Sequence, residues 1–282
     1  ALTISQSANL SVTQNTVPGK IKYAEVRVSD STGNIVQCAE TDGNGDFSFQ
    51  LPKNSGNYTV AVASRASNLN YKAYVLNNPT ENVFYTVSKS VSTSSNTSAL
   101  QLVAKATGTL EGGAFNILDQ IYKANKFLRD QTTNCSGTFS SCTPFTVAPE
   151  IHAYWAKGVN PGTYFGLTNP ISFYLPGQSE LYLMGGLNGD VDASDTDHFD
   201  NSVIIHEYGH FIEDIYAQTD SPGGSHNGNS IIDPRLAWGE GWANFFQAAV
   251  TGNPVYRDTS GNIDGTPGVY FNVDIENVET IG

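Results

Sequence analysis

The segment 203-VIIHEYGHFIED-214 places two histidines, His206 and His210, four residues apart, with Glu207 directly after the first. In a helix, residues i and i+4 lie on one face about one turn apart. Two imidazoles so placed can both bind one zinc ion at roughly 2.0–2.1 Å. Glu207, slightly off that face, can act as a general base on a water molecule at the zinc. The alternative is an ordinary buried helix that carries two histidines.

The residues around these histidines predict a helix with one buried side. Its apolar positions recur at helical spacing, and Asp200 just before them is a candidate N-cap. The expected buried positions are Val203, Ile204, Ile205, Phe211, Ile212 and Ile215.

A catalytic zinc site has three protein ligands and one open position. A metzincin-type third histidine is excluded, because the residues three and six after His210 are Glu213 and Tyr216 rather than Gly and His. The segment 237-AWGEGWANFF-246 offers Glu240 instead. A lone carboxylate in an apolar, aromatic helix is costly to bury unless it is paired, and zinc is a suitable partner. The alternative is a glutamate on the exposed side of that helix.

HEYGH followed by WGEGWANF resembles the zinc-binding pair of the gluzincin metallopeptidases of the fungalysin and thermolysin type, over residues 195–250. The resemblance implies that His206, His210 and Glu240 bind zinc and that Glu207 is the general base. Those families usually have an aspartate four residues after the third ligand. Here that residue is Asn244, whose amide oxygen can still accept the imidazole N–H, with less negative charge on the ligand.

The resemblance also implies an oxyanion donor, an edge strand that pairs with substrate, and a C-terminal helical lobe. We expect the edge strand at 180–185, and an internal strand is the alternative for these residues. The donor candidates are His226, in the Gly-rich loop between the helices, then Tyr256 and Tyr270, or a residue beyond Gly282. Because few residues follow Glu240, we expect a C-terminal segment or chain to complete the active site.

The composition narrows the class of protein. The 282 residues carry a formal charge of −13, so a nucleic-acid partner is not expected. No apolar run reaches the length of a transmembrane segment. Cys135 and Cys142 bracket a flexible loop and predict a disulfide, which indicates a secreted or cell-surface protein; two free thiols are the alternative. Cys38, in an apparent strand, is expected to be a small buried hydrophobe.

The chain divides into two expected domains. Residues 1–105 show short alternating segments at 22–28, 47–51 and 58–62, which predict a β-sandwich. The turn 41-TDGNGD-46 is expected to form a hairpin, and the block resembles the carboxypeptidase-regulatory-like β-sandwich. The Ser/Thr-rich stretch 88–99 is expected to be a linker or surface loop. Residues 106–282 are expected to form a zincin-like α+β domain, so the predicted fold class is α+β.

Within residues 106–282, the spacing predicts a helix at 113–130, strands at 150–155, 171–175 and 180–184, and a second helix after Pro234. Before the HEYGH helix lies an acidic run that could bind Ca²⁺; helix capping and a solvated loop explain it equally well. Its members are Asp190, Asp192, Asp195, Asp197 and Asp200. His198, in the same run, is expected at the surface.

The sequence predicts a secreted zinc endopeptidase that hydrolyses peptide bonds of a peptide or protein substrate, with Glu207 activating a water on the zinc. A surface adhesion protein with a structural or inactive zinc site is the alternative. The general base argues against that alternative, because a structural site has no use for one. A zinc amidase acting on cell-wall peptides would share the same residues.

Overall fold

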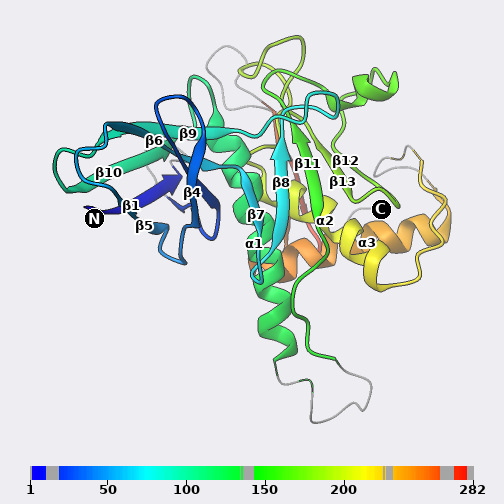
Figure 1. The fold of residues 1–282 in the computed structure, drawn as a ribbon. Coiled ribbons are helices and arrows are strands. Elements are labelled where there is room, and N and C mark those ends of the chain that lie inside the picture. Colours follow the sequence, from blue (N-terminus) through cyan, green and yellow to red (C-terminus); the bar gives the residue numbers. More distant parts are fainter. Residues whose placement is uncertain are drawn as a thin grey trace. The chain divides into compact units, whose positions relative to one another are not determined.

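The computed structural model describes residues 2–10, 19–133, 135, 143–224, 226, 231–260 and 270–277. Helices and sheets both contribute, so the predicted α+β class is confirmed (Figure 1). The chain forms two compact units, Ala1–Tyr122 and Lys123–Gly282. This division falls inside α1 (Glu111–Thr132), whereas the sequence places the domain boundary at residue 105. The assignment of separate domain roles stays a prediction.

The first unit contains two four-stranded sheets and a short hairpin. In one sheet β1 pairs with β10, β2 and β5, and the second sheet has the order β4-β3-β6-β9. The strands are β1 (Leu2–Leu10), β2 (Gly19–Lys20), β3 (Glu25–Ser29), β4 (Ile35–Glu40), β5 (Asp46–Leu51), β6 (Asn57–Ala63), β9 (Thr86–Ser92) and β10 (Thr97–Ala104), and the hairpin is β7 (Arg65–Ser67) with β8 (Lys72–Leu76).

Alternation explains the core of this unit. In β5 every second residue is buried, because side chains on a strand point to opposite faces in turn. The buried apolar residues come from both sheets and include Val26, Val28, Phe47, Phe49, Val60, Val62 and Leu102. The TDGNGD turn forms, with the Asp42 carboxylate accepting the N–H groups of Asn44 and Asp46. It joins β4 and β5 in different sheets, so it is not a hairpin turn.

Two expectations for this unit are wrong. In the Ser/Thr-rich stretch 88–99, residues 88–92 belong to β9 and residues 97–99 to β10, and the turn 93–96 joins them, so the stretch is not a linker. In β9, Val91 is buried, whereas Ser88, Ser90 and Ser92 are exposed. Cys38 is free and exposed rather than buried, because β4 is the last strand in its sheet order and presents it to solvent.

The second unit contains a three-stranded arrangement, two long helices and a strand pair. β13 (Glu180–Leu183) lies between β11 (Ile151–Trp155), to which it is parallel, and β12 (Phe173–Leu175), to which it is antiparallel. A 3₁₀ turn, η1, spans Pro161–Phe165. The helices are α2 (Asn201–Tyr216) and α3 (Pro234–Thr251), and β14 (Val255–Thr259) pairs with β15 (Tyr270–Asp274). These elements confirm the predicted helices and strands of the region.

α2 and α3 pack closely, as Figure 1 shows. Gly209 makes this possible, because a Cβ at that position would lie 3.2 Å from both Ala243 Cα and Phe246 Cδ1. Burial of Phe211 and Phe246 fills the rest of the contact. The two helices that carry the predicted zinc ligands are therefore held side by side. Among the described helices, none is both long and apolar enough to cross a membrane.

Candidate metal centre

α2 begins directly after Asp200, as predicted, but Asp200 makes no side-chain capping bond. Its carboxylate instead accepts hydrogen bonds from the N–H of Thr259, at 2.7 Å, and from its hydroxyl, at 2.9 Å. The helix buries the expected apolar positions, with one exception. Ile215 is 38% exposed, because it lies in the last turn, where the helix leaves the core.

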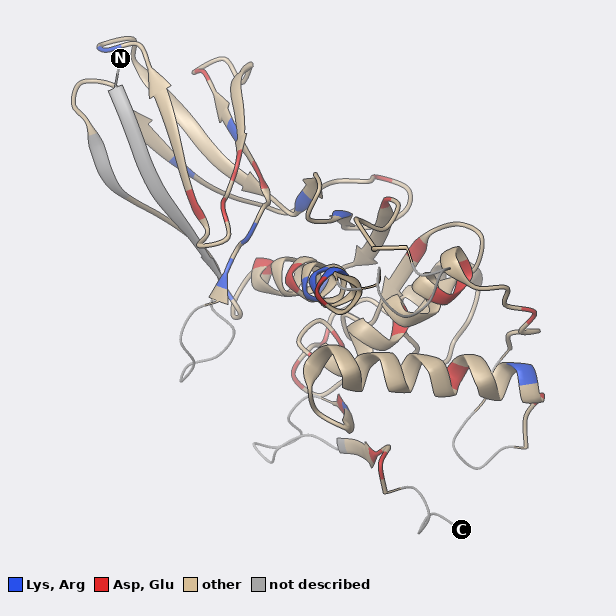
Figure 2. Cartoon of the chain, turned by 90° about the horizontal axis from the view of Figure 1, so that it is seen from below, with Lys and Arg blue, Asp and Glu red and all other residues tan. Residues whose placement is uncertain are grey.

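α3 begins at Pro234, and the Asp233 carboxylate caps it by accepting the N–H of Arg235 at 2.9 Å. Arg235 and Glu240 are the charged residues of this helix, and Figure 2 shows it almost free of charge elsewhere. The Glu240 side chain is 20% exposed and faces α2 rather than open solvent. The alternative that Glu240 lies on the exposed side of its helix is therefore wrong.

His206, His210 and Glu240 converge on one point. The two Nε2 atoms lie 3.2 Å apart, and Glu240 Oε2 lies 3.2 Å from His206 Nε2. Glu240 Oε1 lies 3.6 Å from His210 Nε2. These three residues offer one donor atom each within 4.8 Å of one another.

The donor set fits a zinc ion. The Nδ1 N–H of His206 donates to Asn244 Oδ1 at 3.1 Å, which leaves the Nε2 lone pair pointing at the cluster. Tetrahedral bonds of about 2.0–2.1 Å would separate neighbouring donors by about 3.3 Å, close to the spacings found here. Burial alone would raise the pKa of Glu240, but the two imidazoles of His206 and His210 beside it hold that pKa below its usual range.

Glu213 is a contact of the cluster that sequence reasoning missed. Its side chain is 8% exposed, and its Oε2 lies 3.9 Å from His210 Nδ1, on the side of the ring away from the cluster. Gly239 leaves room for this carboxylate, because a Cβ there would lie 3.2 Å from Glu213 Oε2. Burial acts to lower the pKa of His210, but the adjacent carboxylates of Glu213 and Glu240 raise it to about 10. An acidic residue three positions after His210 was the available signal.

Glu207 is buried at 8% exposure beside the cluster. Its Oε2 accepts the backbone N–H of Tyr174, in β12, at 3.0 Å. Burial raises the pKa of Glu207, and the nearby His206 and His210 offset part of that effect. A carboxylate with a raised pKa, fixed by one backbone hydrogen bond, is suited to accept and release a proton.

His226 also reaches the cluster. Its Nε2 lies 3.3 Å from Glu240 Oε1, and its Nδ1 N–H donates to the carbonyl oxygen of Gly224 at 3.0 Å. Both ring nitrogens therefore face oxygen acceptors, an arrangement in which the ring serves as a hydrogen-bond donor.

Tyr256 of β14 packs on His206 with its ring centroid 5.4 Å from the imidazole. Burial raises its pKa well above the usual range, and the charges of Glu207 and Asp197 add to that effect. The hydroxyl is therefore kept as a neutral donor. The side chain of the other tyrosine candidate, Tyr270, lies outside the described side chains.

The expected edge position of the strand at 180–185 is wrong, and the alternative of an internal strand is confirmed. β13 occupies residues 180–183 and lies between β11 and β12, so its backbone groups are already paired. β12 is the last strand in this order and the one that contacts Glu207. The sequence could not separate the two, because both are short apolar strands.

The acidic run does not act as one group. Asp190 and Asp192 are exposed, whereas Asp195 and Asp197 gather with Asp258 of β14. The predicted surface position of His198 is wrong: it is 4% exposed, its ring lies 4.9 Å from that of Trp155, and burial lowers its pKa to about 4.

The disulfide prediction is tested on one side only. Cys135 is disulfide-bonded, and Cys142 lies outside the described residues.

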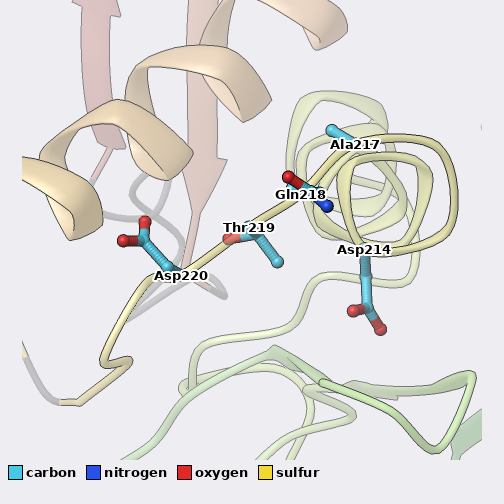
Figure 3. A pocket seen from close by; sticks show the side chains of 5 residues that line it. All are labelled: Asp214, Ala217, Gln218, Thr219 and Asp220. Carbon is cyan, nitrogen blue, oxygen red and sulfur yellow. The ribbon is translucent and has the colours of Figure 1, made fainter.

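A hollow at the end of α2 is distinct from the metal cluster. It is lined by Asp214, Ala217, Gln218, Thr219 and Asp220 (Figure 3). Asp214 Oδ2 accepts hydrogen bonds from the Tyr174 hydroxyl at 2.6 Å and from the Gly177 N–H at 2.8 Å. These bonds connect the end of α2 to β12 and the turn after it. The hollow includes none of the predicted site residues.

Comparison with known proteins finds a family model that matches part of the second unit. The family model described as Mycolysin C-terminal domain matches residues 130–267, which include His206, His210 and Glu240. This match supports a relationship to metallopeptidases of the fungalysin and thermolysin type. Among curated proteins, none matches the chain.

Proposed function

We propose that the chain is a zinc-dependent endopeptidase of the gluzincin type, with His206, His210 and Glu240 holding the ion. The convergence of two Nε2 atoms and the Glu240 carboxylate carries this proposal. Asn244 and Glu213 face the outer nitrogens of the two imidazoles, as expected for supports of ligand rings. The family match to residues 130–267 supports the same class.

Glu207 is the proposed general base. A zinc ion held by the three ligands supplies Lewis-acid chemistry, polarising a carbonyl and lowering the pKa of water. Glu207 accepts the proton of the attacking water and delivers it to the leaving amine. The hydrogen bond from the Tyr174 N–H to Glu207 Oε2 fixes the carboxylate for both transfers.

His226 and Tyr256 are the proposed donors to the oxyanion. His226 lies against Glu240, and Tyr256 packs on His206, so the two approach the cluster from different segments. Each offers an N–H or O–H, which is what a developing oxyanion requires.

The substrate is proposed to be an extended peptide that pairs with β12. This strand is last in its sheet order, and its Tyr174 N–H points towards Glu207 rather than towards β13. Strand addition would therefore bring a scissile bond close to the general base. The disulfide at Cys135 supports a secreted or cell-surface location.

Metal content and peptidase activity, measured together, test the proposal. The wild-type chain should bind about one zinc, as catalytic three-ligand sites do, and cleave an unstructured protein substrate. Glu240→Ala should lose both. Zinc without cleavage, even on a longer chain, would favour the adhesion protein with an inactive site. An absence of zinc after metal-replete purification would overturn the proposal.

A further inference from the structure

A second cluster of carboxylates lies in the same unit. Asp195, Asp197 and Asp258 each offer one oxygen, and these oxygens lie within 4.8 Å of one another. Asp195 and Asp197 precede α2, whereas Asp258 belongs to β14. An isolated backbone bridge between Asp195 and Ser260 holds the two segments together. The cluster is therefore built by tertiary structure from residues some 60 positions apart.

Asp197 is the buried centre of this cluster. It is 2% exposed, and its Oδ2 accepts a hydrogen bond from the Ser172 hydroxyl. Its Oδ1 is buried and accepts no hydrogen bond in the part of the chain that the structure describes, and the same holds for Asp195 Oδ1. A buried carboxylate oxygen without a partner is strongly unfavourable. Something else must neutralise these two oxygens.

The neighbouring aspartates differ from the cluster in this respect. Asp200 is buried, but Thr259 donates both its N–H and its hydroxyl to that carboxylate. Asp190 is exposed and accepts the N–H of Asp192 at 2.8 Å. Only Asp195 and Asp197 from the acidic run thus leave a buried oxygen unsatisfied among the described residues.

We propose that Asp195, Asp197 and Asp258 bind a calcium ion. All three ligands are carboxylate oxygens, which Ca²⁺ prefers, and backbone carbonyls and water would complete its six to eight ligands. Zinc is a poorer match, because protein zinc sites draw on imidazole and thiolate. This inference does not depend on the zinc site or on peptidase activity.

The ion would tie β14 to the segment that leads into α2. Tyr256 lies two residues before Asp258 and packs on His206, so β14 is also a wall of the metal centre. Calcium would hold that wall in place. Burial and the charges of Asp258 and Asp200 raise the pKa of Asp195 to about 7, as expected for carboxylates that repel one another without a cation.

Calcium binding can be measured on the purified chain after chelator treatment and reloading with zinc. We expect titration calorimetry to report one Ca²⁺ site in the wild type. At a Ca²⁺ concentration about 100-fold above Kd, Tm should rise by about 5–10 °C. Asp195→Asn/Asp197→Asn should lose the binding heat and the Tm shift. Asp192→Asn, which removes an exposed charge outside the cluster, should keep both.

The Tm measured without calcium shows whether the double variant folds. Because the amides relieve repulsion, its Tm without calcium should equal or exceed that of the wild type without calcium. If the wild type shows neither binding heat nor a Tm shift on addition of calcium, the proposal is overturned. Protons shared between the carboxylates would then be what neutralises them. Equal loss in Asp192→Asn would overturn it as well, since that residue lies outside the cluster. Zinc content, measured in every sample, separates this result from a failure of the zinc site.

Discussion

The backbone N–H of Tyr174 donates to Glu207 Oε2 at 3.0 Å, which connects the last strand of the β12-β13-β11 order directly to α2. The Tyr174 hydroxyl donates to Asp214, about two turns further along the same helix. One residue of β12 therefore contacts two carboxylates of α2. This arrangement places the strand that we propose to pair with a peptide next to the proposed general base.

Glu207→Gln should keep the hydrogen bond from Tyr174, because the amide oxygen still accepts it, but the amide cannot accept a proton. We expect kcat to fall by about 10²–10⁴-fold, the usual contribution of a general base, with zinc content unchanged. Peptidase kinetics and elemental analysis check this. A parallel loss of zinc would show that Glu207 is needed for the metal cluster rather than for proton transfer.

Asn244→Ala removes the acceptor that orients His206. We expect zinc affinity to fall by about 10–100-fold, as for other supports of histidine ligands. Asn244→Asp keeps the acceptor and adds negative charge, so its zinc affinity should equal or exceed that of the wild type. Competition with a chromophoric chelator measures both variants. Equal affinity in Asn244→Ala and the wild type would exclude this role.

Glu213 should support His210 in the same way, and Gly239 provides the test. In Gly239→Ala the added Cβ would lie 3.2 Å from Glu213 Oε2, so the carboxylate must move and zinc affinity should fall. Gly241→Ala is the matched control, because a Cβ there meets no atom within 4 Å. Similar zinc affinities in the two variants would mean that the position of Glu213 does not matter to His210.

His226→Gln and Tyr256→Phe separate the two proposed oxyanion donors. Loss of one donor should lower kcat by about 10²–10³-fold, and zinc should stay bound in both variants. Tyr256→Phe keeps the ring that packs on His206, so only the hydroxyl is tested. If both variants retain wild-type kcat on a chain that cleaves peptides, the donor belongs to another segment.

The raised pKa of Tyr182 leads us to expect that the folded state becomes less stable at high pH. Burial, and then the hydrogen bond to Glu180, raise its pKa well above the usual value of about 10. Above about pH 10 the folded state therefore keeps the Tyr182 proton, whereas the unfolded state loses it. The free energy of unfolding is not reduced by this group below about pH 10, and it declines as the pH rises further. Denaturant unfolding of Tyr182→Phe should show a shallower decline above pH 10 than the wild type. Identical slopes at high pH, with similar stability at pH 8, would contradict this.

Local pattern was enough to predict the two helices that carry the candidate metal ligands. The i, i+4 spacing of His206 and His210 needs only helical periodicity, which neighbouring apolar residues supply over a few turns. Pro234 and Asp233 similarly define the start of α3 from local backbone chemistry alone. Asn244 as the partner of His206 followed from a resemblance rather than from spacing, and the contact forms at 3.1 Å.

Strand assignments were less successful where burial depends on neighbours. Residues 88–92 and 97–99 have the composition of a linker but form strands, because adjacent strands supply the hydrogen bonds. His198 was misplaced for a related reason. Its acidic neighbours in sequence suggested the surface, yet Trp155 covers its ring.

The sequence by itself determined which residues could bind a metal, because ligand chemistry and helical spacing are local properties. Only the tertiary structure decided which groups surround them. Glu213 faces His210 through the space left by Gly239, and Asp258 joins Asp195 and Asp197 across some 60 residues. Such contacts form where separate elements pack, so the local periodicity of the sequence cannot predict them. The close approach of α2 and α3 at Gly209 is what turns two helices with suitable side chains into one site.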